Sequence, residues 1–357
     1  MGMLGGQIQF VIGVDTHRDT HTAAVCDPAG AVLTDATVPT TTAGHRRLLG
    51  LAQRQASGRR VWAVEGTGSF GAGLTSLLVN QGELVVEVDR PKRPARRNGA
   101  KSDALDATRA AREVLAREQL AQPRARGDRE AMRVLLATRR CVVDARTKAI
   151  NQLKALIVSA PPGLRDRLRR RCTAAQVRCC ARLRVHASHS IEHRVTVQAM
   201  RTTARRILFL EAEAAQHQAE LDRLVAKVAP FLLGELGIGA LTAAQLLVSW
   251  SHPGRVRSEA AFAMLAGVAP LEASSGRVTR HRLNRAGDRQ LNRALHVIAL
   301  TRLRQDPTTS RYVARRRAQG KSDKEIRRCL KRILARKLFR LMERELTPRP
   351  PHRLDRT

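Results

Sequence analysis

The run Gln7-Ile-Gln-Phe-Val-Ile-Gly-Val14 is mainly apolar and leads directly into Asp15. This composition predicts a buried strand that ends at an acidic side chain. Four further runs predict strands in the first part of the chain: Thr22–Cys26, Val32–Val38, Val61–Val64 and Glu83–Asp89. The first three strands follow one another closely, which indicates a meander. Helical patterns at 43–55 and 70–81 then predict a mixed sheet covered by helices, and therefore the α/β class.

Helical patterns dominate the chain from about Ala104 onward. Apolar residues at helical spacing predict three long helices: Ala104–Gln119, Arg129–Val158 and Val195–Val228. The second helix is stopped by Pro161-Pro-Gly163, and an Arg- and Cys-rich stretch with weak periodicity, 164–196, separates it from the third. This pair predicts an antiparallel, coiled-coil arm. A two-helix hairpin packed on its own domain is the alternative.

The last part of the chain predicts a mainly helical domain with a short tail. It opens near Leu236 and ends in a basic helix, Lys324–Glu343. The tail has no apolar pattern, so we expect it to be disordered. The expected organisation is an α/β domain at 7–122, a helical arm at 123–230, a helical domain at 231–345 and a disordered tail at 346–357.

Charge is distributed unevenly along the chain. The sequence has 65 basic and 31 acidic residues, a formal net charge of +34, and 56 of the basic residues are arginine. Residues 1–90 have a net charge of −1, residues 91–120 of +4 and residues 121–357 of +31. Because guanidinium groups bind phosphate oxygens bidentately, this excess indicates a nucleic acid partner rather than a membrane. A GC-rich genome would explain arginine over lysine, but not the asymmetry.

The cysteines and the apolar stretches indicate where the protein acts. None of the six cysteines forms a Cys-x-x-Cys pair, so neither a disulfide framework nor a zinc site is expected. No secretion or myristoylation signal is evident, and no apolar stretch reaches the roughly 18 residues that span a bilayer. We therefore expect a cytoplasmic protein with no membrane partner.

Four acidic residues stand where they could hold metal ions. Asp15 and Glu65 each follow a predicted strand, and Asp103 and Asp106 are three residues apart at a predicted helix start. Residues three apart lie on the same side of a helix, so the pair can face one way. Clustered carboxylates repel one another unless cations neutralise them, and Mg²⁺ is the usual partner in phosphoryl transfer. Each acid alone could equally be a turn residue or a helix-dipole partner.

Two later segments could contact DNA. Gly237-Ile-Gly239, between helical patterns, could turn backbone N–H groups toward a phosphate, or could be a plain helix cap. Ser274-Ser275-Gly276 lies in a polar loop that is followed by several arginines. A serine in such a loop could attack a phosphodiester while guanidinium groups hold the phosphate. Turn formation alone is the alternative.

These motifs, in this order, resemble the DEDD transposases of insertion-sequence family 110, which are recombinases guided by a bridge RNA. The resemblance rests on Val11-Ile-Gly-Val-Asp-Thr-His17, Val64-Glu-Gly-Thr-Gly-Ser69, Lys101-Ser-Asp-Ala-Leu-Asp-Ala107, and the Gly-Ile-Gly and Ser-Ser-Gly blocks. It covers roughly residues 9–160 and 231–342, and the 101–107 block is its most discriminating part. The stretch 164–196 does not match.

The resemblance implies an RNase H-like, RuvC-like domain, a helical arm and a C-terminal transposase domain with a helix-hairpin-helix-like element. It further implies Mg²⁺ or Mn²⁺ on Asp15, Glu65, Asp103 and Asp106, and a serine that bonds to a DNA 5′ end. Ser275 is our first choice as that nucleophile, and Ser274 is the second. The implied partners are donor and target DNA and a bridge RNA. The resemblance also implies a homo-oligomer, dimer or tetramer, that is associated with the bacterial nucleoid. The expected nucleic acid contacts are Lys101, Gly237, Gly239, Arg277, Arg280, Arg282, Arg285 and Arg289.

Two other functions fit the same sequence features. In a metal-only RuvC-like nuclease, water would attack the phosphate and the serines would be structural. In a non-catalytic nucleic-acid-binding protein, the fold would remain without the chemistry.

Overall fold

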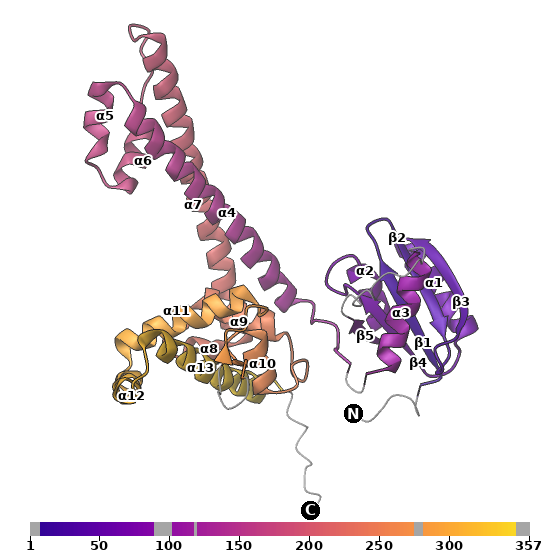
Figure 1. The fold of residues 1–357 in the computed structure, drawn as a ribbon. Helices are drawn as coiled ribbons and strands as arrows, with labels where there is room; N and C mark the ends of the chain where they lie inside the picture. Colours follow the sequence, from indigo (N-terminus) through magenta and orange to yellow (C-terminus); the bar gives the residue numbers. More distant parts are fainter. Residues whose placement is uncertain (1–7, 89–101, 118–119, 275–280, 348–357) are drawn as a thin grey trace, which may run out of the picture. The chain divides into compact units, whose positions relative to one another are not determined.

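The computed structural model describes residues 8–88, 102–117, 120–274 and 281–347 (Figure 1). The chain divides into two compact units, residues 1–125 and residues 126–357. Within the described residues, no helix combines the length and the apolar character needed to cross a bilayer. The tail predicted to be disordered, 346–357, lies almost wholly outside the described residues.

The first unit is built on a five-stranded mixed sheet with the order β3-β2-β1-β4-β5. Its strands are β1 (Phe10–Thr16), β2 (Thr20–Cys26), β3 (Val32–Pro39), β4 (Arg60–Glu65) and β5 (Leu84–Val88). β1, β2 and β3 form an antiparallel meander, and β4 and β5 continue from β1 in parallel. The predicted mixed sheet and meander are confirmed, and the architecture is that of an RNase H-like domain.

Helices cover both faces of this sheet, as Figure 1 shows. α1 (Thr42–Gln55) and α2 (Ala72–Asn80) pack on the face that carries Val14 and Val64. α3 (Asp103–Leu115) packs on the opposite face, over Val11 and Ala63. Successive side chains of a strand point to opposite faces. Gly13 and Asp15, which are two and four residues after Val11, therefore lie on the same face as Val11, the face that α3 covers.

Gly13 allows α3 to lie directly on β1. A Cβ atom at Gly13 would come within 1.9 Å of the carbonyl oxygen of Ala107 and 2.7 Å of the amide nitrogen of Ala111. Only a residue without a side chain permits this backbone contact. The first turn of α3 is thereby fixed beside the end of β1.

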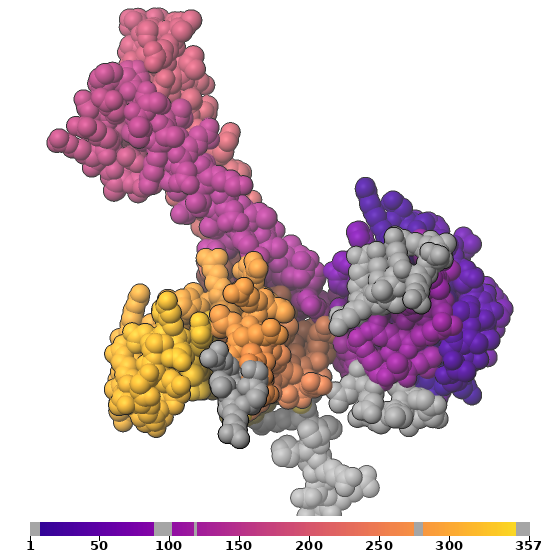
Figure 2. All heavy atoms as spheres, viewed as in Figure 1, coloured from indigo at the N-terminus to yellow at the C-terminus, as the bar shows by residue number. Residues whose placement is uncertain are grey.

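The second unit is a long helical arm on a helical body. α4 (Asp128–Ser159) and α7 (Ile191–Val228) pack along each other and form the arm, which projects from the body in Figure 2. The weakly periodic stretch 164–196 holds most of α5 (Pro162–Arg169), all of α6 (Thr173–Ala181) and the start of α7. These two short helices close the far end of the arm over a separate apolar core. α7 begins at Ile191, four residues before the predicted start.

The helical body ends the chain. It consists of α8 (Pro230–Leu233), α9 (Ala240–Trp250), α10 (Glu259–Leu265), α11 (Arg289–Gln305), α12 (Pro307–Ala318) and α13 (Asp323–Leu346). Its core includes Met132 and Leu221 from the base of the arm, so arm and body share one apolar interior. A two-stranded hairpin, β6 (Leu271–Glu272) and β7 (His281–Arg282), interrupts the helices where a loop was predicted.

Candidate functional site

Two of the predicted metal ligands stand at the same end of neighbouring strands. Val14 of β1 is in register with Val64 of β4, so the next residues along these parallel strands are Asp15 and Glu65. Thr16 ties the two strand ends together, because its Oγ1 donates a hydrogen bond of 2.9 Å to the carbonyl oxygen of Glu65. Because side chains alternate between the two faces along a strand, both acidic residues lie on the face of the sheet that α3 covers.

The other two predicted ligands lie in the first turn of α3. Ser102 caps this helix, and its Oγ accepts a hydrogen bond of 3.2 Å from the amide of Leu105. Asp103 and Asp106 follow the cap directly. Because Gly13 holds α3 against β1, the helix start and its two acids are carried to the end of β1.

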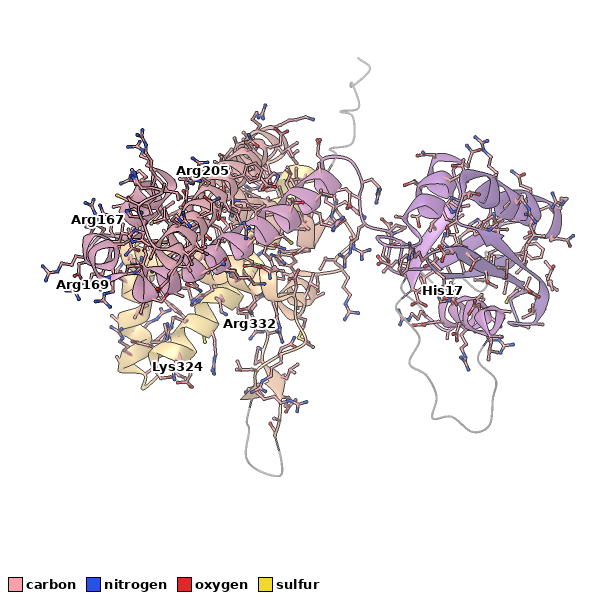
Figure 3. All side chains as sticks on the ribbon, turned by 90° about the horizontal axis from the view of Figure 1, so that it is seen from above. His17, Arg167, Arg169, Arg205, Lys324 and Arg332 are labelled. Carbon is pink, nitrogen blue, oxygen red and sulfur yellow. The ribbon has the colours of Figure 1, made fainter. Side chains whose placement is uncertain are left out.

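His17 links the two sets of acids and was missed as a site residue in the sequence analysis. Its Nε2 lies 3.2 Å from Oδ2 of Asp15 and 3.4 Å from Oδ1 of Asp103. The ligand atoms of these three residues all lie within 4.8 Å of one another. His17, labelled in Figure 3, begins the short turn between β1 and β2, and that turn brings its ring back toward Asp15. Its position two residues after Asp15 is the only sequence signal.

The electrostatics of the cluster favour a bound cation. Burial raises the pKa of Asp15, the contact with His17 lowers it, and the nearby charges of Asp103 and Asp106 raise it again. Asp106 is also bonded to Arg109, whose Nη1 donates a hydrogen bond of 2.7 Å to Oδ1. A buried carboxylate beside two others is costly when all are ionised, and a divalent ion relieves that cost. Carboxylate oxygens are also the ligands that Mg²⁺ prefers, so the donor set fits such an ion.

The predicted serines belong to the hairpin of the second unit. Ser274 is exposed and follows β6 by two residues, whereas Ser275 lies outside the described residues. Lys101, Arg277 and Arg280 also lie outside them.

The remaining predicted contacts divide into two groups. Arg282, Arg285 and Arg289 line a cavity of about 670 Å³ at the foot of the hairpin. Gly237 has a positive φ of 87°, and a Cβ there would lie 3.1 Å from the carbonyl oxygen of Ile298 in α11. Gly239 caps α9, and its amide donates a hydrogen bond of 3.1 Å to Oγ1 of Thr242. The close packing of Gly237 against α11 and the capping of α9 by Gly239 therefore account for these glycines without a nucleic acid contact.

Comparison with known proteins identifies the family. A family model for the DEDD transposases of IS110, described as Transposase, matches residues 12–162. A second model, described as Transposase IS116/IS110/IS902 family, matches residues 232–314. The chain belongs to the IS110 family of transposases. It is therefore an enzyme, a DNA transposase, and the resemblance found in the sequence is confirmed.

Two relatives come from insertion elements as well. The transposase is 26% identical over 359 residues to the insertion element IS900 uncharacterized 42 kDa protein of Mycobacterium paratuberculosis, covering 87% of this chain and 89% of the relative. It is 36% identical over 96 residues to the insertion element IS110 uncharacterized 43.6 kDa protein of Streptomyces coelicolor, covering 27% of this chain and 24% of that protein. Membership of the DEDD family implies DNA as substrate and the use of a divalent metal.

Proposed function

We propose that the transposase cuts and exchanges DNA strands with divalent ions, Mg²⁺ or Mn²⁺, held by Asp15, Glu65, Asp103 and Asp106. The observation that carries this proposal is that the imidazole of His17, at the end of β1, contacts the carboxylates of both Asp15 and Asp103. Asp106 is close enough for its charge to raise the pKa of Asp15, so a third carboxylate lies near the same point. When bound, such ions would stabilise the charge that develops on the attacking and leaving oxygens.

We further propose that a serine of the hairpin, Ser275 or else Ser274, is the nucleophile. Its Oγ would form a bond to phosphorus while the bond from phosphorus to the 3′ oxygen breaks. The serine hydroxyl loses its proton and the leaving 3′ oxygen takes up a proton, so the products are a 5′-phosphoserine and a free 3′ hydroxyl. Attack by the 3′ hydroxyl of a second strand would reverse these bonds and join the exchanged strands. The exposure of Ser274 and the cationic cavity at the foot of the hairpin support this role.

The proposed partners follow from the charge of the chain and from the family resemblance. The net charge of +31 on residues 121–357 supports a large polyanion, and we propose a bridge RNA in addition to donor and target DNA. We also propose that the transposase acts as a homo-oligomer, dimer or tetramer, as the family resemblance implies. Sequencing of RNA that co-purifies with the full-length transposase tests the RNA partner.

Trapping of the covalent adduct tests the chemistry. Labelled DNA carrying the ends of the element is incubated with Mg²⁺ and run on a denaturing gel. We expect Ser275→Ala to reduce the adduct by roughly a hundredfold or more, as removal of a nucleophile does. Asp15→Asn should abolish cleavage while DNA binding remains. Ser188→Ala, which removes an exposed hydroxyl from the arm, is the control.

The same gel distinguishes the alternative functions. An adduct that persists in Ser274→Ala, Ser275→Ala and the double variant would exclude the serines. Cleavage without any adduct would indicate a metal-only nuclease instead. A separate excision assay tests the third alternative, because unchanged excision of the element by Asp15→Asn would indicate a protein that only binds nucleic acid.

A further inference from the structure

Residues of five segments line the cavity at the foot of the hairpin. The segment after α10 contributes uncharged residues, whereas β7 and the residues after it, the first turn of α11, the end of α12 with the turn that follows it, and the first half of α13 contribute cationic side chains. Its volume of about 670 Å³ lies within the range of roughly 300–1,000 Å³ that is typical of ligand pockets. The cationic residues in its described lining are Arg282, Arg285, Arg289, Arg316, Lys321, Arg328, Lys331 and Arg332.

The single carboxylate in this described lining, Glu325, is already committed to local bonds. Its Oε2 accepts hydrogen bonds from the amide and the hydroxyl of Ser322, at 2.9 and 2.8 Å, and forms the capping box of α13. Its other oxygen lies 3.9 Å from Nζ of Lys321. Among the described residues, Arg328 and Arg332 form no ion pair. The positive charge of the cavity is therefore largely unneutralised.

The second half of α13 behaves differently. Arg336 and Arg340 both pair with Glu259 of α10, and Nζ of Lys337 lies 2.8 Å from Oε2 of Glu235. These cations are thus neutralised by acids of the body. Arg328 and Arg332, which line the cavity, thus lack the acidic partners that Arg336, Lys337 and Arg340 have on the same helix.

Lys331 is held in place inside this charged lining. Its Nζ donates a hydrogen bond of 2.8 Å to Oδ1 of Asn292, and the Nδ2 of Asn292 donates one of 2.8 Å to the carbonyl oxygen of Ala266. The second bond fixes the orientation of the amide, so Lys331 is positioned rather than free. Burial lowers the pKa of Lys331, and the charges of Arg328 and Arg327 lower it further. An anion beside the ammonium group would offset both effects.

The walls of the cavity are preformed by close backbone contacts. A Cβ on Gly287 would lie 2.3 Å from the amide nitrogen of Gly267, so the two chain segments touch. The amide of Asp288 donates a hydrogen bond of 2.7 Å to the carbonyl oxygen of Leu265. The Oδ1 of Asp288 accepts hydrogen bonds from the amides at the start of α11 and so caps that helix. The hairpin foot, α10 and α11 are therefore locked together around the cavity.

We propose that this cavity is a phosphate-binding pocket that holds the backbone of a DNA strand, with Lys331, Arg328 and Arg332 as its principal contacts. The ligand is a phosphodiester because the described lining of the pocket offers several cations and contains no Phe, Tyr or Trp on which bases would stack. DNA is favoured as its source because the pocket adjoins the hairpin that carries the proposed nucleophile, and in this respect the inference rests on the proposed function. The matched family segment ends at residue 314, before α13, so that match does not include these contacts.

Binding of short DNA by full-length protein tests the pocket without requiring catalysis. Asp15→Asn is the parent, and a fluorescent twelve-nucleotide single strand is titrated by anisotropy at several salt concentrations. We expect Arg328→Gln with Arg332→Gln to weaken binding by about tenfold. The negative slope of log affinity against log salt should become shallower by about 1.4, since each phosphate contact on a single strand contributes about 0.7 to its magnitude. Lys331→Gln should weaken binding by a similar factor.

A matched control separates a pocket from general charge. Lys324→Gln with Lys337→Gln also removes two charges from α13, but neither residue lines the cavity; Figure 3 labels Lys324 and Arg332 on this helix. We expect this control to change affinity by less than threefold. An equal loss of DNA affinity in both double variants would overturn the proposal of a specific phosphate-binding pocket. Because Arg332 is exposed, the single variant Arg332→Gln gives a reading that loss of folding does not confound.

Two further probes identify the ligand. Inorganic pyrophosphate should raise the melting temperature of the parent and should have little effect on the Arg328 and Arg332 double variant. RNA of the same sequence should bind no tighter than DNA. A clear preference for RNA that the double variant removes would overturn the DNA assignment. Failure of the adduct experiment would leave these binding results standing, and the reverse also holds.

Discussion

The two units of this transposase each hold a cluster of like charges, but they build it in opposite ways. In residues 1–125, short carboxylates are fixed by backbone geometry, at the end of β1 and in the first turn of α3. In residues 126–357, long cationic side chains surround a cavity. A divalent ion demands ligands at set distances, whereas a phosphate backbone tolerates variation in its contacts. The difference indicates that the first unit depends on precision and the second on the number of its charges.

Substitution of Gly13 should produce the largest effect, because it attacks that precision. In Gly13→Ala the new methyl group would overlap the Ala107 carbonyl, so α3 must move away from β1 and carry Asp103 with it. We expect metal-dependent cleavage to fall by roughly a hundredfold, as small displacements of catalytic groups can cause. The free energy of unfolding of this unit should fall by about 1–3 kcal/mol. Cleavage assays and chemical denaturation measure the two effects.

Gly68→Ala provides the control for Gly13. A Cβ atom at Gly68 would meet no atom within 4 Å, so this variant should behave like the parent. Full cleavage activity in Gly13→Ala would show that the carboxylates do not depend on the contact between α3 and β1.

The sequence predicted the acidic cluster better than the cationic cavity, for a physical reason. Asp15 and Glu65 follow apolar runs whose period of two also fixes the face of the sheet. The contact of His17 with Asp103 depends on how the turn after β1 closes, and no local pattern encodes that. Arg282 and Arg289 were expected to bind nucleic acid, but their neighbours Arg328 and Lys331 come from a distant helix whose packing the sequence does not reveal.

The arm shows the same limit. Long amphipathic patterns predicted most of α4 and α7, because each helix spans many turns. α5 and α6 are short, and their buried residues Leu164 and Val177 join a core that includes Ile207 of α7. Periodicity over eight or nine residues is weak, so these helices become recognisable only with their partners present.

Removal of His17 should have an intermediate effect and should sharpen the contrast between the units. In the absence of metal, Nε2 of His17 lies 3.2 Å from Asp15 and 3.4 Å from Asp103, within hydrogen-bonding distance of both carboxylates. His17→Ala should therefore lower the stability of the metal-free first unit by about 1 kcal/mol, the typical scale of one hydrogen bond. Added Mg²⁺ should restore most of that loss, because a divalent ion would neutralise the neighbouring carboxylates. Thermal melts with and without MgCl₂ measure both effects.

The opposite response would assign His17 a different role. If Mg²⁺ or Mn²⁺ stabilised His17→Ala less than the parent, the imidazole would be a metal ligand. Melting of the second unit should be unaffected in either case, which provides an internal control.

Acid should produce the smallest effect, and it should again separate the units. Within the described chain, the buried histidines are His21 and His45, and both belong to the first unit, where their rings stack with centroids 5.2 Å apart. Burial lowers the pKa of His21, and the neighbouring charge of His45 lowers it further; burial also lowers the pKa of His45. The unfolded chain therefore takes up protons first as the pH falls, and stability is lost below a pH of about 6.5.

Tryptophan fluorescence can measure this loss in one unit at a time. The chain has two tryptophans, Trp62 in the first unit and Trp250 in the second, and both are buried. In a Trp250→Phe background, the Trp62 signal should report a melting temperature that falls between pH 7.5 and 5.5. His45→Gln should reduce that pH dependence, because one buried group no longer titrates and its charge no longer acts on His21. An unchanged dependence would place the acid sensitivity outside the histidine pair, and an equal fall reported by Trp250 would show that the units do not unfold separately.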